Sequence, residues 1–275
     1  MFRFAVTACL LAACSSQPAA RSASAGCRER VVSLHDVTTE AVLRYHAQPC
    51  LVGVAEPTDL ATELSAQLTG IPRVESTESI LATRPTQVLA LATVAEHLPE
   101  LFRELDRRGI GWTAPRLERL SDVTSLAADL GKRVDREAAS RVFTEKLTSA
   151  RSQASGGKRP RVFVFDCCAP PFTAGRRAVI TDLLAHAGAD NVFADVDDDW
   201  FHASWEAAIQ RRPDLVLIDD YGNSSALAKK RQALAQIAPL AKLPVIVLPL
   251  RDALGTIRSA EVILKLTSAI AGSSG

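Results

Sequence analysis

Two adjacent cysteines, Cys167 and Cys168, are the residues of this 275-residue chain whose types and spacing most directly suggest chemistry. Neighbouring thiols can close a vicinal disulfide, bind a soft metal ion, or pack as a small apolar pair. A thiol oxidoreductase would need Cys-x-x-Cys beside a helix N-terminus, and that spacing is absent from the sequence. The favoured interpretation is a disulfide or free pair that contacts a ligand, and direct metal ligation is the alternative.

Aromatic residues are scarce, at 5% of the chain, so their positions are informative. Phe172, Trp200 and Tyr221 fall outside the predicted helices, and aromatic faces can bury a large, flat, partly apolar ligand at little entropic cost. The phenolate of Tyr221 could also ligate haem iron. Alternatively, one or two of these rings pack inside the domain, as we expect for Trp205 on a predicted helix.

Motifs for several other kinds of chemistry are missing from the sequence. There is no Gly-x-Ser-x-Gly elbow, P-loop or Gly-x-Gly-x-x-Gly, and no nucleophile pairs by pattern with His35-Asp36. A bare zinc or manganese site needs several histidines and carboxylates, whereas the five histidines show no paired spacing. We therefore expect no enzyme, no metal centre and no cofactor, and a protein that binds a bare metal ion is the weaker alternative.

Short apolar strands that alternate with helices must position these residues, and this order predicts parallel α/β sheets. The predicted strands are residues 30–34, 51–54, 87–91, 109–112, 161–165, 191–193, 215–218 and 244–248. Ligands bind beyond the carboxyl ends of parallel strands, so residues after the strands are candidates for a cleft between two lobes. They are His35, Asp36, Glu56, Asp59 and Thr93 in the first lobe and Cys167, Cys168, Phe172, Thr173, Trp200, Asp220 and Tyr221 in the second.

The stretch between the two βα patterns is unusually regular. Residues 121–155 contain no proline and one glycine, Gly131, and their apolar residues recur at i, i+3 and i+4. This predicts one long α-helix joining two Rossmann-like α/β lobes, and two shorter helices broken near Gly131 are the alternative. The predicted division is a signal peptide and tether at 1–27, a first lobe at 28–120, the connecting helix at 121–157 and a second lobe at 158–275.

The N-terminal residues to Gly26 are predicted to be a secretory signal peptide and a flexible tether. The apolar run ends in Leu11-Ala12-Ala13-Cys14, which resembles a bacterial lipobox, so Cys14 is predicted to carry a lipid in an exported protein of the periplasm or cell surface. An ordinary cleavage site is the alternative. No other stretch is apolar for long enough to span a membrane. The net charge of +1 argues against nucleic acid as the main partner.

Two further cysteines flank the first two predicted strands. Cys27 lies shortly before the first strand, and Cys50 lies immediately before the second. If these strands are parallel neighbours, both thiols lie at the same edge of the sheet, and export to an oxidising compartment lets them pair. We therefore predict a Cys27–Cys50 disulfide.

Several motifs, in order and spacing, resemble the class III substrate-binding proteins of ABC importers, the ferric-siderophore, haem and cobalamin type. The resemblance extends from about Arg28 to the C-terminus. Its motifs include Arg30-Val31-Val32-Ser33-Leu34, Leu51-Val52-Gly53-Val54, Glu78-Ser79-Ile80-Leu81, Pro171-Phe172-Thr173-Ala174-Gly175, Ser204-Trp205-Glu206 and Asp219-Asp220-Tyr221-Gly222. The sequence departs from the family at His35-Asp36 and Cys167-Cys168, which are ligand-facing positions, so the resemblance does not identify the ligand.

The resemblance implies two α/β lobes bridged by one long helix. It also implies a lipid-anchored protein, expected to be a monomer, that delivers a metal chelate or corrinoid to a membrane permease and its ATPase subunit. In that family one glutamate from each lobe pairs with permease arginines, and Glu78 and Glu206 occupy the matching positions. Alternatively, each is only an acid that favours a helix N-terminus. A cell-surface sensor that binds the chelate without a transporter is the competing function.

Overall fold

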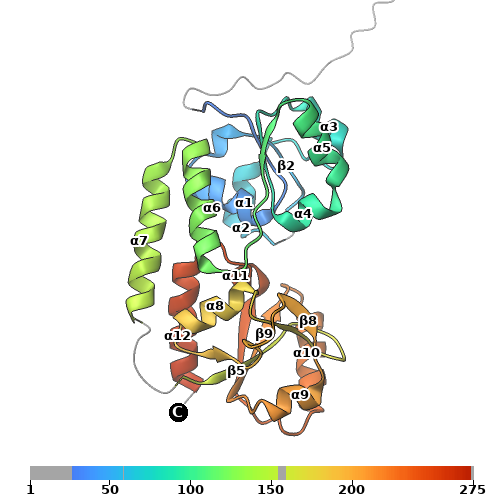
Figure 1. Cartoon of the computed structure of the whole chain (residues 1–275), viewed down its shortest axis with the longest axis vertical. Coiled ribbons are helices and arrows are strands. Elements are labelled where there is room, and N and C mark those ends of the chain that lie inside the picture. Colours follow the sequence, from blue (N-terminus) through green and yellow to red (C-terminus); the bar gives the residue numbers. More distant parts are fainter. Residues whose placement is uncertain (1–26, 58, 154–158, 274–275) are drawn as a thin grey trace, which may run out of the picture.

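The computed structural model describes residues 27–57, 59–153 and 159–273. Figure 1 shows two α/β lobes stacked along the long axis of the molecule, with a layer of helices along one side of both. Each lobe is built on a four-stranded parallel sheet, which confirms the predicted fold class. The predicted signal peptide, tether and lipidated Cys14 lie outside the described residues.

β1 and β3 are the two inner strands of the first-lobe sheet. In spatial order its strands are β2 (Leu51–Val54), β1 (Val31–Ser33), β3 (Gln87–Leu89) and β4 (Gly111–Thr113). Helices cover both faces, so β1 and β3 are buried along their whole length and show no apolar–polar alternation. The surrounding helices and 3₁₀ turns are α1 (Asp36–Arg44), η1 (Gln48–Cys50), α2 (Thr62–Ser65), η2 (Ala66–Leu68), α3 (Thr77–Ala82), α4 (Ala92–His97) and α5 (Pro99–Arg107).

The second lobe repeats this plan and adds a small two-stranded sheet. Its sheet has the order β10 (Val245–Pro249), β9 (Leu215–Asp220), β5 (Arg161–Phe165) and β7 (Asp190–Asn191). An antiparallel pair, β6 (Phe172–Ala174) and β8 (Trp200–His202), stands beyond the carboxyl end of β5. The helices are α8 (Val179–His186), α9 (Trp205–Gln210), α10 (Ser224–Ala235), α11 (Leu250–Ala253) and α12 (Ser259–Ser273).

The connection between the lobes differs from the prediction. Residues 121–157 do not form one long helix: α6 (Leu120–Arg133) and α7 (Glu137–Gln153) pack side by side as an antiparallel hairpin (Figure 1). The alternative of two shorter helices is therefore right. The turn is centred on Asp135, which adopts a left-handed φ of 54°, and Arg136 donates from its backbone N–H to the Gly131 carbonyl at 2.6 Å.

The prediction of one helix was wrong because both helices bury an apolar face. The i, i+3, i+4 spacing of apolar residues therefore continues through the turn, and no glycine or proline interrupts it there. Gly131 has a different role from a helix breaker. A Cβ atom at this position would lie 2.9 Å from the Ser140 side chain, so glycine is what lets α6 and α7 approach this closely.

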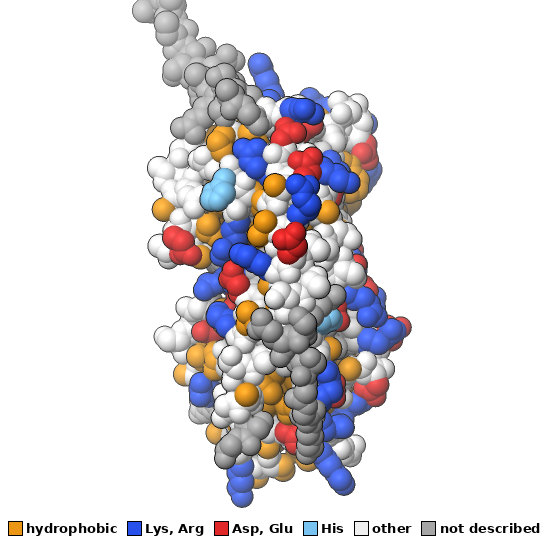
Figure 2. Space-filling model, turned by 90° about the vertical axis from the view of Figure 1, so that its left-hand side faces the viewer, with side chains coloured by type: hydrophobic (Ala, Val, Ile, Leu, Met, Phe, Trp, Pro, Cys, Tyr) orange, Lys and Arg blue, Asp and Glu red, His pale blue; other side chains and the backbone are white. Residues whose placement is uncertain are grey.

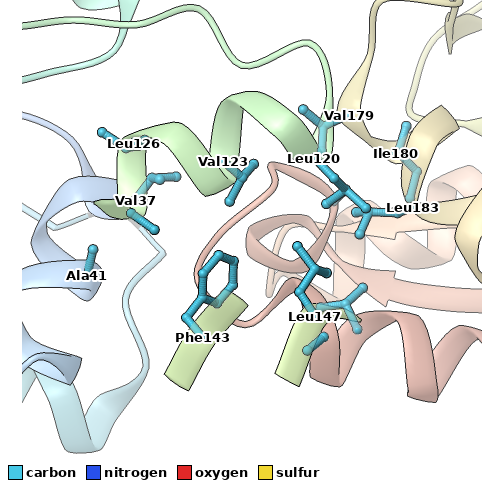
Figure 3. Close-up of a cluster of buried hydrophobic side chains, with 14 of the residues drawn as sticks. Val37, Ala41, Leu120, Val123, Leu126, Phe143, Leu147, Val179, Ile180 and Leu183 are labelled. Carbon is cyan, nitrogen blue, oxygen red and sulfur yellow. The ribbon is translucent and has the colours of Figure 1, made fainter. Parts of the chain in front are cut away.

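One hydrophobic core runs through both lobes (Figure 3). Side chains of α6 and α7 lie between the first-lobe helix α1 and the second-lobe helix α8, and α12 packs along α7. Members labelled in Figure 3 are Val37, Ala41, Leu120, Val123, Leu126, Phe143, Leu147, Val179, Ile180 and Leu183. The lobes are therefore joined by packed apolar surface, which resists large rigid-body movement between them.

The surface mixes charges of both signs. Figure 2 shows the side of the molecule that carries α7 in Figure 1, where basic and acidic side chains are interspersed over both lobes. Among the described residues, no helix combines the length and apolar character needed to cross a bilayer.

Candidate ligand-binding cleft

Two adjoining pockets lie where the lobes meet, and we call them together the inter-lobe cleft. One, of about 180 Å³, is lined by His35, Asp36, Glu56 and Asp59 from the first lobe and by Arg251 and Leu254 among others from the second. The other, of about 160 Å³, is lined by His35 and Thr93 together with Arg177, Trp200 and Leu254 among others. His35 and Leu254 line both pockets, so the two lie next to each other. The inter-lobe cleft brings together the five candidates predicted in the first lobe with Trp200 of the second.

His35 is positioned by the start of α1. Its Nδ1 accepts a hydrogen bond from the Val37 backbone N–H at 3.1 Å, which makes His35 the N-cap of the helix. Burial lowers the pKa of His35, and the neighbouring Asp36 only partly opposes this. The ring is therefore neutral at pH 7, and with Nδ1 accepting, the proton is on Nε2, which can donate to a ligand.

Asp36 and Asp59 line the cleft with carboxylates that accept backbone hydrogen bonds. Asp36 Oδ2 accepts from the Asp59 backbone N–H at 2.8 Å, and Asp59 Oδ2 accepts from the Arg251 backbone N–H at 2.8 Å. The second contact crosses from the first lobe to the second. Burial raises the pKa of Asp59 even though Arg251 opposes the shift. Glu56, by contrast, is exposed at the rim and pairs with Arg73 at 3.0 Å.

A buried ion network lies behind these groups. Arg258, which precedes α12, donates from Nε to Oε1 of Glu40 on α1 at 2.5 Å and from Nη1 to Asp252 on α11. Arg44 and Lys265 extend the network at its two ends. The network therefore ties the first lobe to the second, and its three central charges, on Glu40, Asp252 and Arg258, are almost completely removed from water.

The antiparallel pair β6–β8 supplies the aromatic wall of the cleft. The rings of Phe172 and Trp200 are stacked with centroids 6.0 Å apart, and the ring centroid of His202 lies 4.9 Å from that of Phe172. Trp200 lines the cleft, and Phe172 supports it. Thr173 was predicted to contact the ligand, but this is wrong. Its side chain is fully buried, and its hydroxyl donates to the Val164 carbonyl at 2.6 Å, because successive residues of a strand face opposite sides.

Both predicted cysteine pairs are disulfides in the structure. Cys27 and Cys50 are joined with an S–S distance of 2.08 Å, and Cys167 and Cys168 form the vicinal disulfide that was one of the readings of the pair. The Cys167 carbonyl accepts from the Phe172 backbone N–H at 2.7 Å, so this disulfide lies beside the start of β6. It lines neither pocket of the cleft.

Tyr221 is held by a polar cluster at the carboxyl ends of β5 and β9. Its hydroxyl donates to Asp166, and the Lys230 ammonium lies over its ring, 3.7 Å from the centroid. Burial first, and then the Asp166 carboxylate, raise the pKa of Tyr221, so the side chain is a neutral phenol. This disfavours the phenolate ligation of haem iron that the sequence suggested. Asp220 accepts from the Gly222 backbone N–H at 2.9 Å and closes its own turn.

Sequence reasoning missed Asp219, which is the most unusual group of this cluster. Its side chain is fully buried, and neither carboxylate oxygen has a hydrogen-bond partner among the described residues. Burial, reinforced by the charge of Asp166, raises the pKa of Asp219 to about 8, although Lys230 opposes the shift. The only indication in the sequence is that a charged residue ends an apolar strand. That indication applies equally to Asp219 and Asp220, so it does not show which of the two is buried.

Replacing Asp219 by asparagine is expected to remove a pH-dependent loss of stability. Between the unfolded pKa of about 3.9 and the folded pKa of about 8, the folded protein holds a proton that the unfolded chain has released. The free energy of unfolding therefore falls as the pH rises through this window, by up to about 1.4 kcal/mol per pH unit.

Urea unfolding at several pH values between about 5 and 8 measures this effect. The wild type should lose stability across the series, and Asp219→Asn should lose clearly less. Asp197→Asn, which changes an exposed carboxylate, should keep the wild-type slope. Parallel curves for the wild type and Asp219→Asn would show that Asp219 is not the titrating group.

Other cleft residues were also missed. Arg251 and Leu254 follow β10 at its carboxyl end, so the strand-end rule that selected His35 could have found them. Arg116 and Glu118 lie on the segment that leads into α6, and nothing in the sequence marks that segment as part of a cleft. In the parts of the chain that the structure describes, no group of three or more His, Cys, Asp or Glu side chains could hold a metal ion.

The two predicted docking glutamates occupy equivalent positions in the lobes. Glu78 is the second residue of α3, whose N-cap is Ser76, and Glu206 is the second residue of α9, whose N-cap is Ser204. Both side chains are exposed. The Glu78 backbone N–H and the Ser76 hydroxyl donate to the Glu78 carboxylate and lower its pKa, so it is ionised at neutral pH.

Comparison with known proteins shows which family this chain resembles. The family model described as periplasmic binding protein matches residues 31–239. The high-affinity heme uptake system protein IsdE of Staphylococcus aureus is 22% identical over 169 residues, which cover 59% of this chain and 57% of IsdE, so the match spans less than two thirds of that relative.

Solved structures share the fold over nearly the whole chain. A periplasmic binding protein from Veillonella parvula superposes with a TM-score of 0.81 at 21% identity, covering 90% of this chain and 93% of that one. The periplasmic vitamin B12 binding protein BtuF of Vibrio cholerae gives 0.72 at 18% identity, with 90% and 98% covered. Together with the family match, these similarities confirm the resemblance seen in the sequence: the chain belongs to the periplasmic binding protein family.

Proposed function

We propose that this protein is the substrate-binding component of an ABC importer and captures a metal chelate or a corrinoid in the inter-lobe cleft. The observation that carries the proposal is the cleft itself, lined from both lobes and walled by Trp200, in a chain of this family. Two proteins similar to it are named for heme uptake and for vitamin B12 binding. Both of those ligands are large and carry a flat ring system, which suits an aromatic wall.

The charges of the cleft indicate which ligands fit best. The lining of the cleft is acidic on balance. Its arginines are Arg116, Arg177 and Arg251, whereas its acidic residues are Asp36, Glu40, Glu56, Asp59, Glu118 and Asp199. A ligand with several carboxylates would gain little from such a lining. We therefore favour a neutral or cationic chelate or corrinoid, oriented by the Nε2 donor of His35.

Delivery to a membrane transporter completes the proposal. A lipid on Cys14 would hold the exported protein at the membrane surface, and Glu78 and Glu206 would each contact one side of a permease that is driven by its ATPase subunit. The two exposed glutamates at equivalent helix positions support this arrangement. A surface sensor would bind the same ligand but would not require either glutamate.

The cleft is tested by replacing its aromatic wall. Trp200→Ala should weaken binding of whichever of haem, cyanocobalamin or a ferric hydroxamate binds the wild type, by about 1–3 kcal/mol. Isothermal titration measures the affinity. Trp112→Ala is the matched control, because Trp112 is a partly exposed tryptophan of β4 that packs on Phe102, and its loss should leave the affinity unchanged. Equal affinities in the two variants would remove Trp200 from the site.

A further inference from the structure

A third pocket, which we call the first-lobe pocket, has no part in the function described so far. Its volume is about 390 Å³, more than twice that of either pocket of the inter-lobe cleft. It lies between the carboxyl ends of β1 and β2 and the helices α3, α4 and α5. Its size falls within the range of about 300–1,000 Å³ that is usual for small-molecule sites.

The interior of the first-lobe pocket is apolar. Ile80 and Leu101 belong to the buried core cluster of this lobe, Val94 packs against that cluster, and Leu98 leaves 47% of its surface exposed at the pocket. Polar groups, among them Ser76 and His97, lie at positions where the pocket meets the helix ends. Burial of hydrocarbon against such a lining favours binding, whereas a charged group would lose its hydration without finding a partner there.

The first-lobe pocket adjoins the inter-lobe cleft. Leu34, directly after β1, and Ala55, directly after β2, line both the first-lobe pocket and the cleft pocket that contains His35. An apolar pocket therefore lies next to a molecule bound in the cleft, on the other side of these two side chains. This is also the edge of the sheet at which parallel α/β lobes bind ligands.

We propose that the first-lobe pocket binds an uncharged alkyl or acyl arm of the ligand whose chelate or corrinoid part occupies the inter-lobe cleft. This inference rests on the proposed function, and it narrows the substrate class to ligands that carry such an arm. The acidic side chains at the rim, Glu75 and Glu100, disfavour an arm that ends in a carboxylate. The arm is bound by burial of its methylene groups.

The pocket can be tested in the complete mature protein with neutral N-alkyl dansylamides as probes. Binding should shift the dansyl emission to the blue, and the affinity should rise about fourfold for each added CH₂ from butyl to octyl. Val94→Phe fills the pocket and should weaken binding of the octyl probe at least tenfold. Val142→Phe is the matched control, because Val142 is 48% exposed on α7, away from the pocket.

Three results would overturn the inference: no binding of the octyl probe to the wild type, no dependence on chain length, or equal affinity of Val94→Phe and the wild type. Circular dichroism of Val94→Phe verifies its fold, and Ile80→Phe provides a second filling variant from α3 if Val94→Phe does not fold. Trp200→Ala should bind the octyl probe normally. If the octyl probe binds but no chelate or corrinoid does, the proposed function fails while the apolar pocket stands.

Discussion

Replacing Glu78 and Glu206 together by arginine should abolish uptake and substrate-stimulated ATP hydrolysis in the reconstituted importer, while ligand affinity stays unchanged. Rim charges guide transient protein–protein encounters, and reversing one charge on each lobe would place like charges against the permease arginines that the family resemblance implies. Both side chains are exposed and lie outside the linings of the cleft pockets, so the fold and the ligand site should be unaffected.

The control for this experiment is a second pair of helix N-terminal glutamates. Glu137 opens α7 and Glu261 lies in the first turn of α12, and both are exposed on the helices that run alongside the two lobes. Changing this pair to arginine removes equivalent helix-dipole interactions without touching the proposed docking positions. Normal transport by the Glu78 and Glu206 double variant would show that the two glutamates only favour their helices.

A second large effect is expected from Arg258→Met. Arg258 is 8% exposed, and its partners Glu40 and Asp252 are 4% and 1% exposed, so the substitution removes the buried cation that the two carboxylates share. They keep only Arg44 and Lys265, which are more exposed, as partners. Breaking a buried ion pair from one side typically costs about 3–5 kcal/mol. The free energy of unfolding from urea titrations should fall by up to about this amount, and because the network joins the lobes, both should unfold more readily.

Two further variants make this result interpretable. Arg103→Met removes an exposed pair with Glu100 and should change stability by less than about 1 kcal/mol. Combining Arg258→Met with Glu40→Gln and Asp252→Asn removes the two buried negative charges that lost their shared cation, and it should recover a large part of the loss. If Arg258→Met were no more destabilising than Arg103→Met, the network would not hold the lobes together.

The sequence predicts the sheets well because their signals are local. Apolar runs such as Val31-Val32 and Phe163-Val164-Phe165 are buried strands, and the rule that ligands bind beyond strand ends selected His35, Asp36 and Trp200 correctly for the cleft lining. The position of Cys27 and Cys50 before neighbouring strands likewise predicts a disulfide that the structure contains.

Predictions failed where the outcome depends on contacts between distant segments. The turn between α6 and α7 has no local breaker, and only the packing of both helices against the two lobes explains it. The Glu40–Arg258–Asp252 network joins residues that are up to 218 positions apart, which no periodicity reveals. Thr173 faces the interior because side chains alternate between the two faces of a strand, and a shift of β6 by one residue would have turned it to the other face.

The most direct test of the proposed function is a titration of the purified mature protein with haem, cyanocobalamin and a ferric hydroxamate, followed by tryptophan fluorescence and by the absorption of each ligand. We expect one of these classes to bind with a stoichiometry of one, to quench Trp200, and to have a dissociation constant of about 1 μM or lower, equivalent to about −8 kcal/mol or better. If all three classes fail to bind at concentrations well above this value, the protein is not a receptor for metal chelates or corrinoids.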